Sequence, residues 1–184
     1  MAGGWFDFDN DGWLDLFVVN YVQWSFETER FCGDANRNLR AYCHPRYFAE
    51  LPNTLYRNRG DGTFEDVSRT SGIAAHPEKG MAFAMADCDL DGRMDVFVAN
   101  DNMRNFLFHN LGGGKFEEVA LQAGVAMRDD GATISNMGAD FRDFDNDGLP
   151  DISVVALAGQ TFPLYRNSGK GEFRDAGFAA RWAG

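Results

Sequence analysis

The sequence has few positively charged residues and no long hydrophobic run. Seventeen lysines and arginines stand against 28 aspartates and glutamates, which gives a formal net charge of −11. Because binding to nucleic acid requires a basic surface, this balance argues against nucleic acid as a partner. No stretch approaches the ~18 consecutive apolar residues of a membrane-spanning helix, so no membrane span is expected. The opening residues, Met1-Ala-Gly-Gly-Trp5, lack the basic and hydrophobic regions of a signal peptide.

Residues that carry out catalysis are also scarce. The three histidines, His44, His76 and His109, have no neighbouring serine or cysteine in a nucleophile motif, so no catalytic triad can be assembled. Most of the paired carboxylates that a glycosidase would need belong to a repeated motif with another explanation. We therefore predict that the chain is not an enzyme, and that His109, which replaces the arginine of the sister repeats, is a surface residue of a strand.

That repeated motif is the nine-residue pattern D-x-D-x-D-G-x-x-D. It occurs at residues 7–15, 87–95 and 143–151, here named loops 1, 2 and 3. Calcium takes six to eight oxygen ligands, which carboxylates at alternate positions of a tight turn supply. Glycine at position six suits a sharp turn at positive φ. We predict a calcium ion in each loop, and magnesium is disfavoured because it prefers to keep its bound waters.

Two other interpretations of the loops are less favourable. A plain polar turn is the simplest, because Asp, Asn and Gly are common in turns, but four carboxylates in one turn repel each other without a cation. The twelve loop aspartates account for the acidity, since the other residues would carry a net charge of +1. An EF-hand needs Glu at position twelve, where this chain has Val18, Val98 or Val154. An Asp at position nine takes the closing role, and the β-branched and aromatic residues after it indicate a strand, so each loop is expected to join a hairpin.

A second repeated segment follows each loop, at residues 53–67, 105–119 and 164–175. Each has a short aromatic strand, an Asn/Gly turn and a strand that opens with Phe, which is typical of a hairpin. Repeats of four strands are typical of a β-propeller. We predict an all-β chain of three four-stranded antiparallel blades, forming a partial propeller or open arc. The expected boundaries are 1–70, with a long insertion at about 21–52, then 71–122, and 123–184 with a C-terminal tail.

Together these segments resemble the FG-GAP/VCBS repeats of integrin-α-like propellers, and within that group the bacterial proteins similar to cartilage acidic protein (ASPIC/UnbV type). The likeness covers nearly the whole chain, including Lys79-Gly80-Met81 before loop 2. It implies a secreted or surface-exposed propeller of about seven blades without catalytic residues. The implied calcium ligands are the carboxylates at positions one, three, five and nine and the carbonyl at position seven of each loop. They are Asp7, Asp9, Asp11, Trp13 and Asp15; Asp87, Asp89, Asp91, Arg93 and Asp95; and Asp143, Asp145, Asp147, Leu149 and Asp151.

The insertion contains two cysteines, Cys32 and Cys43, close enough in sequence to form a disulfide. The exported context implied by the repeats favours this pairing, which would stabilise the insertion by ~3 kcal/mol. A metal site with His44 is the alternative, but it lacks a C-x2-C spacing and a clear fourth ligand. Cys88 is expected to be a small apolar residue at the end of a strand.

Three repeats fall short of the four to eight blades that close a propeller. We therefore expect the chain either to belong to a longer propeller or to assemble with copies of itself. Its expected role is a non-catalytic, calcium-binding scaffold or binding surface for a protein or glycan ligand, located extracellularly or at the cell surface, with the periplasm as another location. The alternative is an accessory part of a larger secreted enzyme whose catalytic portion lies outside this chain.

Overall fold

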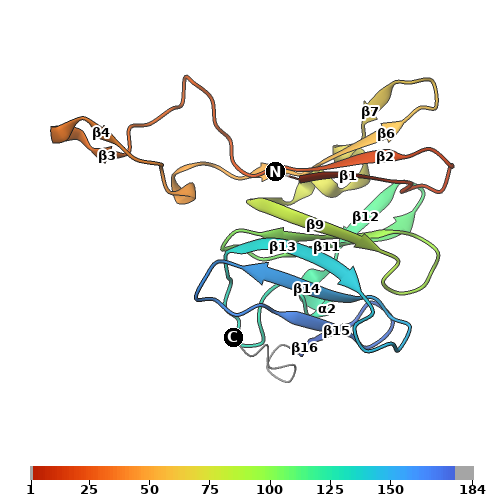
Figure 1. Cartoon of the computed structure of the whole chain (residues 1–184). Coiled ribbons are helices and arrows are strands. Elements are labelled where there is room, and N and C mark those ends of the chain that lie inside the picture. The colour runs from red at the N-terminus through yellow and green to blue at the C-terminus, as the bar shows by residue number, and fades with distance from the viewer. Residues whose placement is uncertain (1, 177–184) are drawn as a thin grey trace.

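A computed structural model describes residues 2–176, which form three four-stranded antiparallel sheets in chain order (Figure 1). Sheet 1 contains β1 (Ala2–Phe6), β2 (Asp15–Val19), β6 (Thr54–Asn58) and β7 (Phe64–Asp66). Sheet 2 contains β9 (Gly80–Ala86), β10 (Asp95–Asn100), β11 (Phe106–Gly112) and β12 (Lys115–Glu118). Sheet 3 contains β13 (Asn136–Arg142), β14 (Asp151–Ala156), β15 (Leu164–Asn167) and β16 (Phe173–Asp175). The all-β prediction is confirmed, and each predicted range contains one of the four-stranded sheets. The predicted tail at 177–184 lies outside the described residues.

Each loop joins the first two strands of its sheet as a hairpin, in the same register every time. The pairs that close the loops are Phe6 with Asp15, Ala86 with Asp95 and Arg142 with Asp151. The third strand also pairs in one register, as shown by Leu16 with Tyr56, Val96 with Phe108 and Ile152 with Tyr165. The predicted hairpins are therefore present, and equivalent residues of the three repeats occupy equivalent places.

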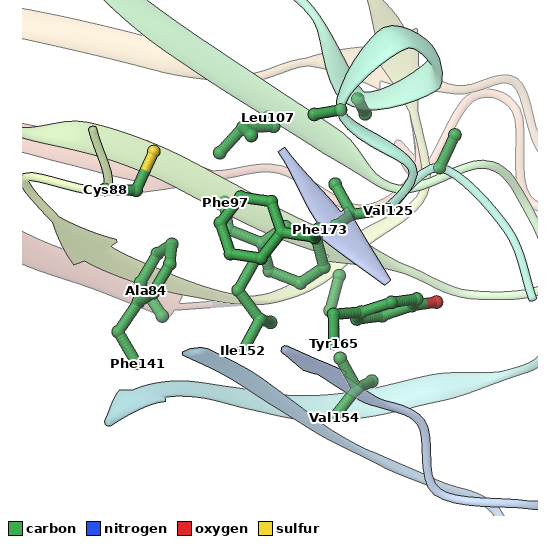
Figure 2. Packing of buried hydrophobic residues seen from close by; sticks show 14 residues of the cluster. Ala84, Cys88, Phe97, Leu107, Val125, Phe141, Ile152, Val154, Tyr165 and Phe173 are labelled. Atoms are coloured by element: carbon green, nitrogen blue, oxygen red, sulfur yellow. The ribbon is translucent and has the colours of Figure 1, made fainter. Parts of the chain in front are cut away.

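The hydrophobic core lies between the sheets because successive side chains of a strand point to opposite faces. In β10, Val96 and Val98 point to the cluster shared with sheet 1, and Phe97 and Ala99 point to the cluster shared with sheet 3. Figure 2 shows the second cluster, where Phe97 faces residues of sheet 3 such as Ile152. Every residue of β10 is buried, so sheet 2 is covered on both faces.

Single-turn helices link the sheets. Helix α1 (Ser68–Ser71) follows sheet 1, and α2 (Ala120–Ala123) follows sheet 2. Each ends at a glycine in the left-handed region, Gly72 at φ 95° and Gly124 at φ 80°. A Cβ on Gly72 would lie 2.8 Å from the carbonyl oxygen of Phe116, and one on Gly124 would lie 2.7 Å from that of Phe173. Glycine is needed because the turn packs directly on the last strand of the next sheet.

The predicted insertion leaves sheet 1 after β2 and extends away from the stacked sheets (Figure 1). Its elements are β3 (Gly33–Asp34), η1 (Ala35–Arg37), β4 (Leu39–Arg40), η2 (Pro45–Tyr47) and β5 (Leu51–Pro52). The last of these pairs with β8 (Pro77–Glu78), which follows η3 (Ile73–Ala75). The Cys32–Cys43 disulfide is confirmed, with Cα atoms 5.3 Å apart. Within residues 2–176, no helix is long and apolar enough to cross a membrane.

Candidate metal centres

The three loops share one backbone conformation, held by the carboxylate at position one. Asp7 accepts hydrogen bonds from the amides of Asp11 (3.0 Å) and Gly12 (2.8 Å), and Asp87 and Asp143 accept the equivalent pairs at 2.8–3.1 Å. The glycine at position six has a φ of 86–89° in all three loops, as predicted from the sequence. Position four also has positive φ, at Asn10, Leu90 and Asn146.

The carboxylate at position nine is buried and held from both sides. Asp15, Asp95 and Asp151 are at most 1% exposed. One oxygen of each accepts from the amide of the loop residue at position two, at 3.1 Å in every loop. The other oxygen accepts from the amide of an asparagine on the third strand, at 2.7–2.8 Å. The ninth carboxylate thus connects its loop to the centre of its own sheet.

Most of the predicted carboxylates converge in space. In each loop at least three of them offer ligand oxygens within 4.8 Å of one another. The converging sets are Asp7, Asp9 and Asp15; Asp87, Asp89 and Asp91; and Asp143, Asp145 and Asp151. The residues at position seven lie in the same turns; they are Trp13, Arg93 and Leu149. The backbone amide of each donates to the carboxylate at position five of its loop, at 2.9 Å. Ligation through the carbonyls at position seven stays a prediction.

The carboxylate at position three of loops 1 and 2 has a buried oxygen, and this feature fits a bound cation. Oδ1 of Asp9 and Oδ1 of Asp89 are buried, and neither has a hydrogen-bond partner among residues 2–176. Burial raises the pKa of both carboxyl groups, and neighbouring loop carboxylates raise it further. A buried carboxylate oxygen without a partner is costly, and a bound cation removes that cost. Because the converging oxygens come from carboxylates, the set suits a hard cation such as Ca²⁺.

A basic residue on the third strand also reaches each loop, a contact that the sequence did not predict. The Arg57 guanidinium lies 2.7 Å from Oδ2 of Asp9 and 3.3 Å from Oδ2 of Asp11. Arg166 makes the equivalent ion pairs with Asp145 (2.5 Å) and Asp147 (3.0 Å) in loop 3. In the sequence, this contact is marked only by the basic residue that precedes the asparagine in each repeat. The register of the third strand places that residue over the loop.

Loop 2 differs because His109 replaces this arginine. Nδ1 of His109 lies 3.1 Å from Oδ1 of Asp95 and 3.8 Å from Oδ2 of Asp89. His109 lies in strand β11, as expected, but its ring is half-buried against the loop carboxylates, a contact that was not predicted. Arg93 pairs with Asp91 in this loop and donates to the carbonyl of Asn110 at 2.7 Å. Cys88 is buried, as expected, but it lies in loop 2 beyond the end of β9, and its thiol donates to Oδ2 of Asp95 at 2.9 Å.

Comparison with known proteins gives the same repeats. A sequence model described as FG-GAP-like repeat matches residues 7–98 and 87–154, and the two matches begin at the first aspartates of loops 1 and 2. The chain belongs to the FG-GAP-like repeat family. The resemblance drawn from the motifs is confirmed, and the matched residues contain all three loops.

Curated relatives are cartilage acidic protein 1 from three species. The chain is 38% identical to the Xenopus tropicalis protein over 74 residues, which is 39% of this chain and 11% of that protein. It is 35% identical to the Homo sapiens protein over 72 residues (38% and 11%) and 33% identical to the Mus musculus protein over 95 residues (52% and 14%). The chain thus spans between 11% and 14% of the length of these relatives, and is a repeat module related to them.

Proposed function

We propose that this chain is a non-catalytic, calcium-binding propeller module, with one calcium ion held in each of its three loops. The observation that carries the proposal is a buried oxygen of the carboxylate at position three of loops 1 and 2, which finds no hydrogen-bond partner in the described part of the chain. Around it, three carboxylates converge in each loop on one backbone conformation. The ligands are the four loop carboxylates and the carbonyl at position seven.

The role of calcium is structural. The ion neutralises carboxylates that otherwise repel each other, and it stabilises the folded chain because it binds only the folded loops. Extracellular calcium modules bind at about 10⁻⁴ to 10⁻³ M, which suits a secreted or surface protein. The Cys32–Cys43 disulfide supports the same location, extracellular, cell-surface or periplasmic, because disulfides persist in oxidising compartments.

The uncovered face of sheet 1 is an interface for one further four-stranded sheet of the same repeat. Leu16 and Val18 occupy the places of Val96 and Val98, which in sheet 2 pack on the preceding sheet. Phe64 is 43% exposed, whereas its equivalents in β12 and β16 are buried. Trp5, 55% exposed, packs on Phe64 with ring centroids 5.7 Å apart. The face carries apolar residues at the same positions as the interfaces between the existing sheets, and therefore suits the same kind of occupant.

The ligand surface is the insertion. Trp24, Phe26 and Tyr42 are between 49% and 105% exposed, and Trp24 packs edge-on against Phe26 at 4.9 Å. Exposed aromatic side chains are enriched at protein interfaces, and the insertion presents them away from the sheets. We assign it the binding of a protein or glycan.

Calcium stoichiometry by equilibrium dialysis tests the proposal. We expect about three ions per chain at millimolar calcium, and the loss of one ion in each of D9N, D89N and D145N. The matched control is D61N, which changes an exposed carboxylate in the turn between β6 and β7. A chain that binds no calcium, or that loses as much in D61N as in the loop variants, would contradict the assignment.

Analytical ultracentrifugation distinguishes the possible occupants of the uncovered face of sheet 1. Self-association of the chain would identify a second copy as the occupant.

A further inference from the structure

An asparagine stands at or near the end of the third strand of every repeat and supports the loop of its own sheet. The three residues are Asn58, Asn110 and Asn167. Each side-chain amide donates to the carbonyl at position eight of its own loop, at 3.0–3.2 Å. Each side-chain oxygen accepts from the amide two residues later, at 2.9 Å. With the backbone bond to the ninth carboxylate, three hydrogen bonds place each asparagine relative to its loop and turn.

Two of these asparagines also cross to the preceding sheet. The amide of Asn110 donates to the carbonyl of Phe8 in loop 1 at 2.8 Å, and that of Asn167 donates to the carbonyl of Cys88 in loop 2 at 2.7 Å. Phe8 and Cys88 both stand at position two of their loops, between the carboxylates at positions one and three. Asn110 and Asn167 are at most 1% exposed. We call these two contacts the cross-sheet bonds.

The cross-sheet bond completes a continuous path between two loops. The backbone of Phe8 is held at two points: its amide donates to Asp15, and its carbonyl accepts from the Asn110 side chain. The backbone amide of Asn110 in turn donates to Asp95 of loop 2. A displacement of Asp95 therefore reaches position two of loop 1 through one buried side chain.

We infer that the cross-sheet bonds couple the loops, so that a cation in one loop strengthens cation binding in the adjacent loop. This rests on the proposed function, because it requires the loops to bind metal. A cation that fixes Asp95 also fixes Asn110, which then holds the backbone of loop 1 in the conformation that its own carboxylates need. Coupling between sites is reciprocal, and one buried hydrogen bond corresponds to an effect of about fivefold in affinity.

A second link joins loops 1 and 2 but is exposed and does not repeat. The Asn10 side chain donates to the carbonyl of Gly92 at 3.2 Å. The equivalent residue of loop 2 is Leu90, whose side chain has no donor. Because water competes for an exposed bond, we assign the coupling to the buried asparagine.

Terbium luminescence of the full chain tests this inference, because loop 1 alone carries a tryptophan within the motif, Trp13. Terbium replaces calcium, and the W13F variant identifies the part of the signal that comes from loop 1. D89N removes a carboxylate from loop 2, and we expect it to weaken terbium binding at loop 1 by about fivefold. In N110A the same D89N change should have no effect on loop 1.

Three further variants keep the test decisive. N110D preserves the shape of Asn110 and the acceptor for Gly112, so it replaces N110A if that variant does not fold. N58A is the matched control: it loses the bond to its own loop, lowers the affinity of loop 1, and keeps the fivefold effect of D89N. N10G preserves the positive φ at position four and should keep most of that effect.

Two results would overturn the inference. The first is a D89N effect of equal size with and without the Asn110 side-chain amide, which would assign any coupling to another route. The second is terbium binding at loop 1 that D89N leaves unchanged. Absence of any terbium binding is a different result, because it contradicts the calcium function itself and removes the coupling with it.

Discussion

Calcium removal should unfold this chain at a much lower temperature. If each loop binds with a dissociation constant of ~10⁻⁴ M, about 10 mM free calcium stabilises it by roughly 2.7 kcal/mol. Three such loops acting independently contribute roughly 8 kcal/mol, and coupling between loops would change this sum. For a chain of this size 1 kcal/mol corresponds to roughly 2–4 °C, so the melting temperature should rise on the order of 15–30 °C.

The pH dependence of this rise follows from the buried loop carboxylates. Burial raises the pKa of Asp9, Asp15, Asp89 and Asp151 in the metal-free chain. The folded metal-free chain therefore binds these protons more tightly than the unfolded chain, and its stability falls as pH rises from the ordinary Asp value through the raised pKa values. Calcium needs the ionised carboxylates, so its contribution is lost as pH falls through the same window. The calcium-dependent rise should be largest near pH ~7 and shrink toward pH ~4.

Scanning calorimetry in chelator, in a calcium series and in an equal magnesium series measures both effects. Magnesium should raise the melting temperature far less, because it does not readily exchange its waters for a set of protein ligands. An equal shift with magnesium would refute the ligand geometry, since general screening of charge would explain it. A melting temperature that does not change with calcium would refute the metal assignment of the loops.

Four other changes have expected results. R57Q should strengthen calcium binding at loop 1 about two- to fivefold by calorimetric titration, because no exposed ion pair must then be displaced; weaker binding would show that Arg57 assists the ion. Cys88 should resist alkylation in the folded chain and react only on unfolding, because burial raises its thiol pKa and excludes reagent, and rapid native labelling would contradict this. F97A should lower the free energy of unfolding in urea by about 3–5 kcal/mol, whereas F26A in the exposed insertion should change it by less than ~0.5 kcal/mol. Reduction of Cys32–Cys43 should make the insertion sensitive to protease while the melting of the sheets changes little, since the insertion extends away from them (Figure 1); a large drop in melting temperature would place it within the folded core.

The sequence was sufficient to predict the features that depend on local spacing. The position of glycine and of the alternating aspartates predicts the turn, because those residues meet each other within nine positions. The strands after each loop follow from β-branched and aromatic residues, and three copies distinguish the pattern from a chance turn. The cysteine pair was predictable for the same reason, since only 11 positions separate the two residues.

The features that depend on register could not be predicted in the same way. Arg57 and His109 reach their loops because β6 and β11 pair with the second strand in one particular alignment. The bond from Asn110 to Phe8 joins residues 102 positions apart and depends on how two sheets stack. The pairing of β5 with β8 also escaped prediction, because each is only two residues long. Short and distant contacts leave no periodic pattern in the sequence.

The two outer faces of the described sheets differ in chemistry, which limits how further sheets can be added. At sheet 1 the outer face presents the pair Trp5 and Leu16, both apolar. At sheet 3 the outer face presents the polar pair Asp140 and Ser153, at the place where sheet 2 has Ala84 and Phe97, beside the exposed Val155. Packing an apolar sheet on Asp140 would remove a carboxylate from water without replacing its hydrogen bonds, whereas packing on sheet 1 buries aromatic surface. A head-to-tail stack of copies would have to pack the outer face of sheet 1 against the outer face of sheet 3. The apolar face of sheet 1 instead favours a partner sheet whose own face resembles the Phe97 side of sheet 2.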